Sequence, residues 1–467
     1  MAIRSRRRID YLTISLYLAL IGIGWLMIYT VGYGDHYQNG ITHFLLKTTV
    51  GKQTIWIGIS LTLLVFLQFI DRNFWRTFAI PVYIGAMVLL IAVLLFGTEI
   101  KGAKSWFSLG GFSIQPSEFA KFATCIIMAH FLSTYRVNLK VRRFQVLALG
   151  ILLIPMGLIL LQPDAGSALV FLSFFIVLYR EGFPSNFFIL SLSFATLLIL
   201  GLRFDPIYVN AALSALMAFF LLTQLKAKWF WYILILGLII GTYALLPAEQ
   251  YLYLLYALLA MVGWMAFRLL VRGASRPAIA SVVSLALGIG LVIAADFSFN
   301  NFLKPHQQDR INVWLNPEKC DPQGSLYNVL QSKMAIGSGG LTGKGFLEGT
   351  LTKGNYIPEQ STDFIFCTIG EEQGFVGTFA IIGLFCLLMI RIATIAERQR
   401  SNFARIYAYG VAGIIFIHFL INIGMTMGIM PIIGIPLPFI SKGGSSLLGF
   451  TLLIGVLLKL DRHRYQI

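Results

Sequence analysis

Two ionisable residues lie close together in a stretch of sequence that is otherwise apolar. Glu118 and Lys121 follow Gln115-Pro116-Ser117, and a spacing of three residues places the carboxylate and the ammonium on one face of a helix. Ionisable groups inside a membrane span are costly, so they are the first candidates for function. The sequence allows two interpretations: a functional site, or a self-neutralising pair that only makes the helix insertable.

Asp164, Asp321 and His418 are polar residues at positions where their chemistry could be used. Asp164 lies in a short turn between two apolar runs, where capping of the next helix explains it sufficiently. Asp321 is held between turn formers in residues 316–324, and an Asp-Pro turn is ordinary loop chemistry. His418, like His130, has no second ligand nearby in sequence, which favours a packed, hydrogen-bonded histidine over a metal site.

The glycine-rich run at residues 337–345, GSGGLTGKG, resembles a phosphate-binding P-loop only in part. Ser338 replaces the first glycine of that motif and Gly345 replaces its Ser or Thr. Its backbone N–H groups, together with Lys333 and Lys344, could still hold a phosphate carried by a lipid or a wall precursor. The alternative is a plain flexible turn.

The composition predicts that membrane-spanning helices position these residues. Hydrophobic residues make up 57% of the chain and charged residues 12%, against about 25% charged in soluble domains. Apolar runs of about 20 residues recur, as crossing a hydrocarbon core requires. We predict an all-α polytopic membrane protein with one integral membrane domain, 1–467, and fourteen spans near residues 11–31, 54–70, 77–97, 116–135, 145–162, 167–180, 186–202, 207–224, 228–247, 250–271, 277–297, 363–391, 405–427 and 445–460.

The net charge of +16 is distributed in a way that indicates topology rather than nucleic-acid binding. Most basic residues lie in every second loop, which is the positive-inside pattern. This pattern places both termini in the cytoplasm and the long polar stretch at residues 298–362 on the external face. Long loops usually carry function, so we expect the catalytic loop there.

Several motifs, in order along the chain, resemble the shape, elongation, division and sporulation (SEDS) glycosyltransferases. Residues 341–346, LTGKGF, are similar to the RodA branch rather than the FtsW branch. Outside residues 186–297 the resemblance covers most of the chain. The motifs are GAKSW at 102–106, QPSEFAK at 115–121, QPD at 162–164, QSKMAIGSGGLTGKG at 331–345, PE at 358–359 with TDFIF at 362–366, and GIPLPFISKGGSS at 434–446.

The resemblance implies a peptidoglycan glycosyltransferase that polymerises lipid II at the outer leaflet of the bacterial cytoplasmic (inner) membrane during cell elongation. Such a transfer needs a base for the attacking hydroxyl and positive charge for the departing pyrophosphate. Asp321 occupies the place of the essential carboxylate, and Glu118 would orient Lys121. The implied substrate-binding residues are Lys121, Glu118, Lys104, Trp106, Asp164, Arg310, Gln331, Lys333, Lys344, Glu359, Asp363 and Ser441.

The family resemblance also implies a partner, a class B penicillin-binding protein that crosslinks the new strand. No metal-ligand spacing is visible, although a divalent cation (Mg or Mn) could neutralise the pyrophosphate. Rival interpretations are a lipid II flippase and a non-catalytic scaffold for wall enzymes.

The chain departs from the family pattern in three places. Ser105 and Lys442 replace the usual Arg and Tyr, and residues 186–297 contain four spans beyond the usual ten. Because four is even, the loop with Asp321 keeps its side of the membrane.

Overall fold

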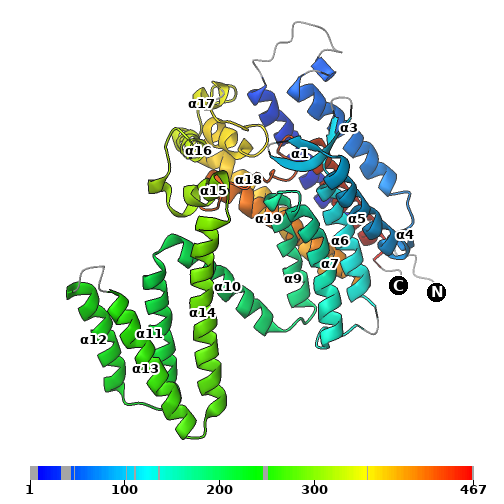
Figure 1. Cartoon of the computed structure of the whole chain (residues 1–467). Helices are drawn as coiled ribbons and strands as arrows, with labels where there is room; N and C mark the ends of the chain where they lie inside the picture. The colour runs from blue at the N-terminus through cyan, green and yellow to red at the C-terminus, as the bar shows by residue number, and fades with distance from the viewer. Residues whose placement is uncertain are drawn as a thin grey trace. The chain divides into compact units, whose positions relative to one another are not determined.

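The computed structural model describes residues 9–32, 44–46, 48–100, 102–109, 112–134, 137–245, 251–324, 326–354 and 356–464. The chain is mostly helical (Figure 1). It forms two compact units, one made of Met1–Ser185 with Asp321–Ile467, the other of Asn186–Cys320.

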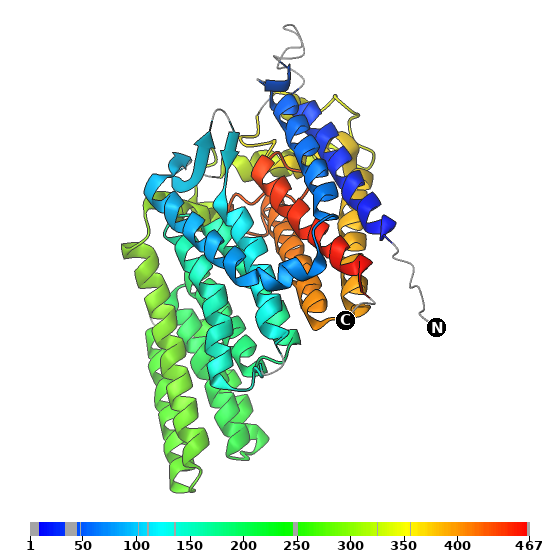
Figure 2. The same cartoon turned by 90° about the vertical axis from the view of Figure 1, so that its right-hand side faces the viewer.

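The first unit is built around two well-buried helices, α19 (Asn402–Thr426) and α20 (Gly444–Arg462). In the most apolar 18-residue stretch of each helix, 67% of the residues of α19 and 83% of those of α20 are buried. In Figure 2 the red α20 lies beside the orange α19, and α20 also packs on α3 and α6. The other helices of this unit are α1 (Tyr11–Val31), α3 (Thr49–Leu67), α4 (Arg72–Thr77), α5 (Ala79–Phe96), α6 (Pro116–Leu132), α7 (Arg142–Leu160), α8 (Ala165–Val170), η1 (Phe171–Ser173), α9 (Phe174–Arg180), α16 (Tyr327–Ser338), α17 (Thr350–Lys353) and α18 (Ile365–Glu397).

Between α5 and α6 the chain forms a small antiparallel sheet that the sequence analysis did not predict. Its strands are β1 (Thr98–Ile100), β2 (Ala103–Leu109) and β3 (Phe112–Ile114), in that order. Gly102, with φ +80°, makes the turn between β1 and β2, a backbone conformation that glycine adopts at little cost. The sheet therefore holds the GAKSW motif in a defined place.

The second unit contains α10 (Ser185–Arg203, whose first residue belongs to the first unit), α11 (Pro206–Gln224), α12 (Trp229–Leu245), α13 (Tyr251–Val271), α14 (Ser275–Asn301), α15 (Pro305–Leu315) and η3 (Pro317–Lys319). Alanines on α11 let α13 and α14 pack closely, and Ala218 is fully buried. Arg203 ties the ends of the unit together, since its Nη1 donates to Asn316 Oδ1 and Glu318 Oε1, both at 2.6 Å. The unit includes residues 186–297, and their origin as inserted spans stays a prediction.

Each of the fourteen predicted spans falls on a helical segment of the structure. Eleven helices are long and apolar enough to cross a membrane among the residues that the structure describes. The other three are α6 and α12, which have 17 residues each, and the interrupted run Ala165–Arg180. A polytopic all-α membrane protein is thus confirmed, and the count of fourteen stays a prediction.

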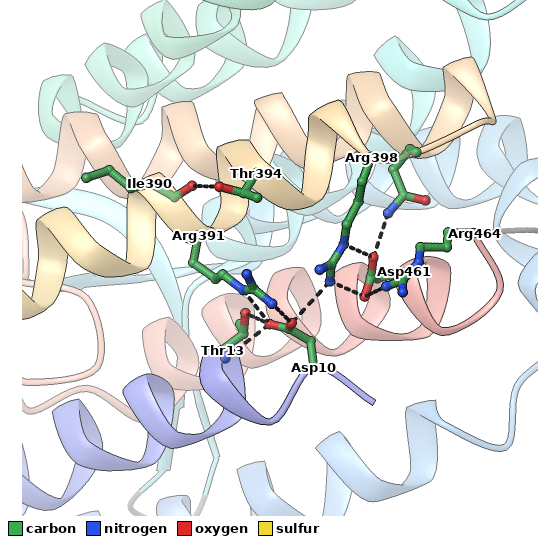
Figure 3. Close-up of polar contacts among 9 residues, drawn as sticks. Asp10, Thr13, Ile390, Arg391, Thr394, Arg398, Asp461 and Arg464 are labelled. Carbon is green, nitrogen blue, oxygen red and sulfur yellow. Dashed lines mark hydrogen bonds and ion pairs between the residues drawn. The ribbon is translucent and has the colours of Figure 1, made fainter. Parts of the chain in front are cut away.

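An ionic network joins the ends of α1, α18 and α20 (Figure 3). Asp10 caps α1 by accepting from the backbone N–H of Thr13 at 3.2 Å, and Arg391 of α18 donates to both of its carboxylate oxygens. Arg398 bridges Asp10 Oδ1 at 3.1 Å and Asp461 Oδ2 at 2.6 Å. Burial by itself would raise the pKa of Asp10, but the hydrogen bonds from Arg391, Thr13 and Arg398 hold this pKa well below its ordinary value.

Asp10→Asn should lower the free energy of unfolding by about 2 kcal/mol, since hydrogen bonds to charged groups are lost. A carboxyl whose folded pKa is depressed contributes stability above its unfolded pKa of about 3.9, and this contribution is lost as the pH falls through the folded pKa. Thermal unfolding in detergent should therefore show a constant gap between wild type and D10N from pH 8 to about pH 5, narrowing only in stronger acid.

Asp71→Asn is the matched control for this change. Asp71 caps α4 by accepting from Asn73 N–H at 2.8 Å, and Asn is an equally good cap. A D71N midpoint as low as that of D10N, or a D10N gap that closes already at pH 6, would contradict the role of the network.

Candidate functional site

Lys121 lies in an enclosed polar site between α6, α19 and α20. It is 1% exposed and Glu118 is 3% exposed, and Lys121 Nζ lies 2.8 Å from Glu118 Oε2. His418 of α19 is its third partner, because its Nε2 lies 2.8 Å from the same Nζ. The ring centroid of Phe450 on α20 lies 5.5 Å from Nζ. The sequence predicted the pair, and the fold adds the histidine and the ring.

The hydrogen bonds of His418 determine its tautomer. Its Nδ1 lies 3.1 Å from the carbonyl oxygen of Pro436, which can only accept, so Nδ1 carries the proton. Nε2 then has a lone pair that accepts from the Lys121 ammonium. The prediction of a packed, hydrogen-bonded histidine is confirmed. The site thus contains one cation, one anion and one neutral ring.

The QPS and QPD motifs meet at the start of α8. Asp164 Oδ1 accepts from Ser167 N–H at 3.0 Å, which confirms the predicted helix cap. Its other oxygen, Oδ2, accepts from Gln115 Nε2 at 2.7 Å, and Ser117 Oγ lies 3.2 Å from Ser167 Oγ. Asp164 therefore joins the loop before α8 to the start of α6, next to the pair on that helix.

The glycine-rich run packs directly against a break in α18. At Gly374 the backbone leaves the helical region, with φ 62° and ψ −157°. The N–H groups of Phe375 and Val376 therefore donate to the carbonyls of Gly340 and Leu341, at 2.9 and 3.0 Å, instead of to those four residues earlier in the helix.

The two carbonyls that the break releases accept from the same run. Glu371 O and Glu372 O accept from the N–H groups of Lys344 and Gly345, each at 3.0 Å. The phosphate-cradle interpretation is therefore wrong for these N–H groups, because α18 already occupies them. The run is also no flexible turn, since a Cβ added to Gly343 would lie 2.0 Å from Glu372 O.

Glu371 holds the loop that follows the glycine-rich run, a role that the sequence analysis missed. Its fully buried carboxylate accepts from Lys344 Nζ at 2.7 Å and from three successive N–H groups at the start of α17, at 2.8 to 2.9 Å. Lys344, predicted to bind substrate, forms an ion pair inside the protein here. The signal in the sequence that could have pointed to Glu371 is a pair of acidic residues, Glu371 and Glu372, shortly before Gly374 in an otherwise apolar run.

Ser441 and Asn422 fasten the segment at 434–446 to the start of α18. Ser441 Oγ donates to Thr362 O at 2.6 Å and accepts from Leu437 N–H at 2.8 Å. Asn422 Nδ2 of α19 donates to Asp363 O at 2.9 Å and to Ile435 O at 2.7 Å. Polar side chains thus form hydrogen bonds with backbone groups of a non-helical segment that is rich in proline.

The other predicted site residues of the first unit are spread over its loops and helix ends. Lys104 Nζ donates to Leu95 O at 2.9 Å, and Trp106 pairs with Thr98 across β1 and β2. Glu359 is exposed, and its backbone carbonyl accepts from three following N–H groups. On α16, Gln331 has a buried Oε1 without a hydrogen-bond partner among the described residues, and Lys333 is exposed.

Asp321 is exposed at a turn, as its Asp-Pro sequence predicted. Its Oδ1 accepts from Gln323 N–H at 3.0 Å, and its carbonyl accepts from Gly324 N–H at 3.1 Å. Oδ2 has no hydrogen-bond partner among the described residues. Arg310 is exposed on α15 and belongs to the other compact unit. No group of three His, Cys, Asp or Glu that could hold a metal ion lies in the part of the chain that the structure describes.

Comparison with known proteins gives full-length matches. The FtsW, RodA and SpoVE family, described as cell cycle proteins, matches residues 11–220 and 214–466. Peptidoglycan glycosyltransferase RodA of Treponema pallidum is 34% identical over 99% of this chain and 100% of its own. Peptidoglycan glycosyltransferase MrdB of Escherichia coli K12 is 29% identical over 87% and 84%. A solved chain of a peptidoglycan synthase complex that coordinates polymerization and crosslinking has TM-score 0.63 and 26% identity, covering 98% of this chain and 99% of that chain.

Gly374→Ala should destabilise the protein, because the φ and ψ of Gly374 lie in a region that is essentially restricted to glycine, at a cost of about 1–3 kcal/mol. The added Cβ would also lie 2.3 Å from Gly343 N. We expect a lower thermal unfolding midpoint in detergent. Gly383→Ala in the same helix is the control, since a Cβ there meets nothing within 4 Å. Equal midpoints for G374A and G383A would refute the role of the break.

Proposed function

Since the chain belongs to the FtsW/RodA/SpoVE family and is a peptidoglycan glycosyltransferase, we propose that it polymerises lipid II during cell elongation. Lipid II is a disaccharide carried on undecaprenyl pyrophosphate. The observation that carries the proposal is the similarity, over 99% of the chain, to a peptidoglycan glycosyltransferase of the RodA type.

In the proposed reaction, the 4-hydroxyl of the acceptor GlcNAc attacks the anomeric carbon of the growing strand. The bond from O4 to that carbon forms, the bond from the carbon to the pyrophosphate oxygen breaks, and the α linkage becomes a β-1,4 glycoside. The hydroxyl proton passes to a base, and undecaprenyl pyrophosphate leaves with the bonding electron pair. A base and positive charge near the pyrophosphate are the two requirements on the protein.

Asp321 is the proposed base. Its turn supports this role, because the hydrogen bond from Gln323 N–H to Oδ1 orients the carboxylate while Oδ2 has no hydrogen-bond partner among the described residues. A general base must come within hydrogen-bond reach of the proton that it removes. An exposed carboxylate of fixed orientation can do so once the substrate is bound.

The proposed cationic ligands of the pyrophosphate differ in how available they are. Lys333 and Arg310 are exposed, whereas Lys104 donates one hydrogen bond to a backbone carbonyl. Lys344 is paired with Glu371. Lys121 is enclosed by Glu118, His418 and Phe450, so it reaches a substrate only if these neighbours move.

Trp106, Asp164, Gln331, Glu359, Asp363 and Ser441 remain proposed substrate-binding residues. The hydrogen bonds of Asp164 and Ser441 support a positioning role for both, because they fasten segments that flank the pair on α6 and the start of α18.

The proposed orientation has both termini in the cytoplasm and residues 298–362 outside, where a lipid-linked sugar is available. The distribution of basic loops supports it. A class B penicillin-binding protein is the proposed partner, supported by the likeness to a chain from a complex that coordinates polymerization and crosslinking.

Asp321→Asn should abolish polymerisation of purified lipid II by the protein with its partner transpeptidase, because an amide cannot accept the hydroxyl proton. Loss of a general base costs about 10²- to 10⁴-fold in rate. Glycan strands are measured by gel separation. Asp309→Asn, at an exposed carboxylate of α15, is the matched control and should polymerise normally. Strands made by D321N at the wild-type rate would refute the catalytic assignment. If the wild-type protein instead moved lipid II across vesicle membranes and made no polymer, a flippase would be favoured.

The double variant E118Q/K121M separates the two interpretations of the buried pair. It removes both charges and keeps similar volumes, so it leaves no unpaired buried charge, a defect that costs about 3–5 kcal/mol. We expect a thermal midpoint close to that of wild type, with polymerisation reduced at least about 100-fold. If this stable variant polymerised lipid II at the wild-type rate, the pair would have a purely structural role.

A further inference from the structure

A group of basic residues lies at one end of the second unit. They belong to the loops that join α11 to α12 and α13 to α14, or to the helix turns beside them, and Figure 1 shows both loops at the same end of the unit. Arg272 Nη1 donates to Leu225 O at 3.1 Å and so joins the two loops. The group, called the basic cluster below, consists of five exposed residues: Lys226, Lys228, Arg268, Arg272 and Arg276.

The two loops of the basic cluster leave their helices in the same way. After α11, Lys226 has φ 51°, and Ala227 N–H donates to a carbonyl in the last turn of that helix at 3.0 Å. After α13, Gly273 has φ 79°, and Ala274 N–H donates in the same way at 2.9 Å. In this arrangement backbone groups satisfy the last carbonyls of a helix. Apart from Arg272, the cationic side chains are therefore not needed as caps.

The carboxylates of the second unit do not cancel this charge. No residue of the basic cluster forms an ion pair among the described residues. The described carboxylates of the unit lie at the start of α11 or from the end of α14 onward: Asp205, Asp296, Asp309 and Glu318. Glu249 lies outside the described residues and follows α12 in the sequence, whereas Lys226 and Lys228 precede that helix.

Helix dipoles leave the charge of the basic cluster unchanged. Two helices, α11 and α13, end beside it, and two others, α12 and α14, begin there. The negative ends of the first pair oppose the positive ends of the second pair. The side chains therefore determine the local potential, which attracts an anion.

Exposed tryptophans beside the basic cluster indicate the surroundings in which this anion is met. Trp229 follows Lys228 directly and is 74% exposed. Trp264 is 48% exposed, and its ring centroid lies 4.9 Å from the guanidinium carbon of Arg268. Tryptophan is enriched at membrane–water interfaces, and α11, α13 and α14 are candidate spans. The basic cluster is thus at the level of the lipid headgroups.

We propose that the basic cluster binds the phosphate of an anionic phospholipid at the membrane surface. Clusters of four to eight Lys and Arg beside spanning helices are typical of sites for acidic lipids, and arginine donates two parallel hydrogen bonds to a phosphate. The cluster lies within residues 186–297, so lipid binding gives the predicted inserted spans a role. The proposal does not depend on the glycosyltransferase mechanism, so either can fail without the other.

The test uses the full-length protein in neutral detergent, and native mass spectrometry measures retention of added phosphatidylglycerol against phosphatidylcholine. Wild type should retain phosphatidylglycerol preferentially. K226Q/K228Q leaves the bond from Arg272 to Leu225 intact and should bind phosphatidylglycerol roughly 30-fold more weakly, as expected for two lost surface charges. K226R/K228R keeps both charges and should retain most of the binding.

K304Q/K319Q is the matched control, because it removes two exposed lysines from the other end of the same unit. It should bind phosphatidylglycerol as wild type does. If K226Q/K228Q cannot be purified, R276Q alone should weaken binding roughly fivefold.

Millimolar inorganic phosphate distinguishes a lipid from a free anion. It should leave phosphatidylglycerol bound, because the acyl chains add binding energy that free phosphate lacks. Any one of four results would overturn the proposal: undiminished binding by K226Q/K228Q or R276Q, equal weakening by K304Q/K319Q, equal retention of both lipids by wild type, or full displacement by inorganic phosphate.

Discussion

The exchange of backbone hydrogen bonds between the broken helix α18 and the glycine-rich run fixes the run, with the candidate residue Lys344, on that helix. Four bonds replace those that the break at Gly374 removes. An unpaired backbone group costs several kcal/mol in a medium without water, so the break and the run require each other. Glu371, in the helical turn before the break, then fastens Lys344 and the start of α17.

The same constraint explains the buried side chains. Lys121 can stay charged inside the bundle because Glu118 neutralises it and His418 accepts a second hydrogen bond. Asn422 and Ser441 satisfy backbone carbonyls of segments that are not helical. These links run from α6 through α19 to the segment at 434–446, so the buried pair is coupled to the loop before α20.

Charged groups at the start of α1 and at the ends of α18 and α20 have a different role, which is to join these helices. There Asp10 and Asp461 are shared among three arginines that join α1, α18 and α20.

The sequence by itself determined the membrane class, the helical segments and the family, because hydropathy, loop charge and motifs are local properties of the chain. It also identified the pair of Glu118 and Lys121, the helix cap at Asp164 and the turn at Asp321. Only the tertiary structure decided that His418, 297 residues away from Lys121, is its partner. It also decided that the N–H groups of Lys344 and Gly345 serve α18 instead of a phosphate. Such contacts depend on how distant segments pack, and no local pattern records them.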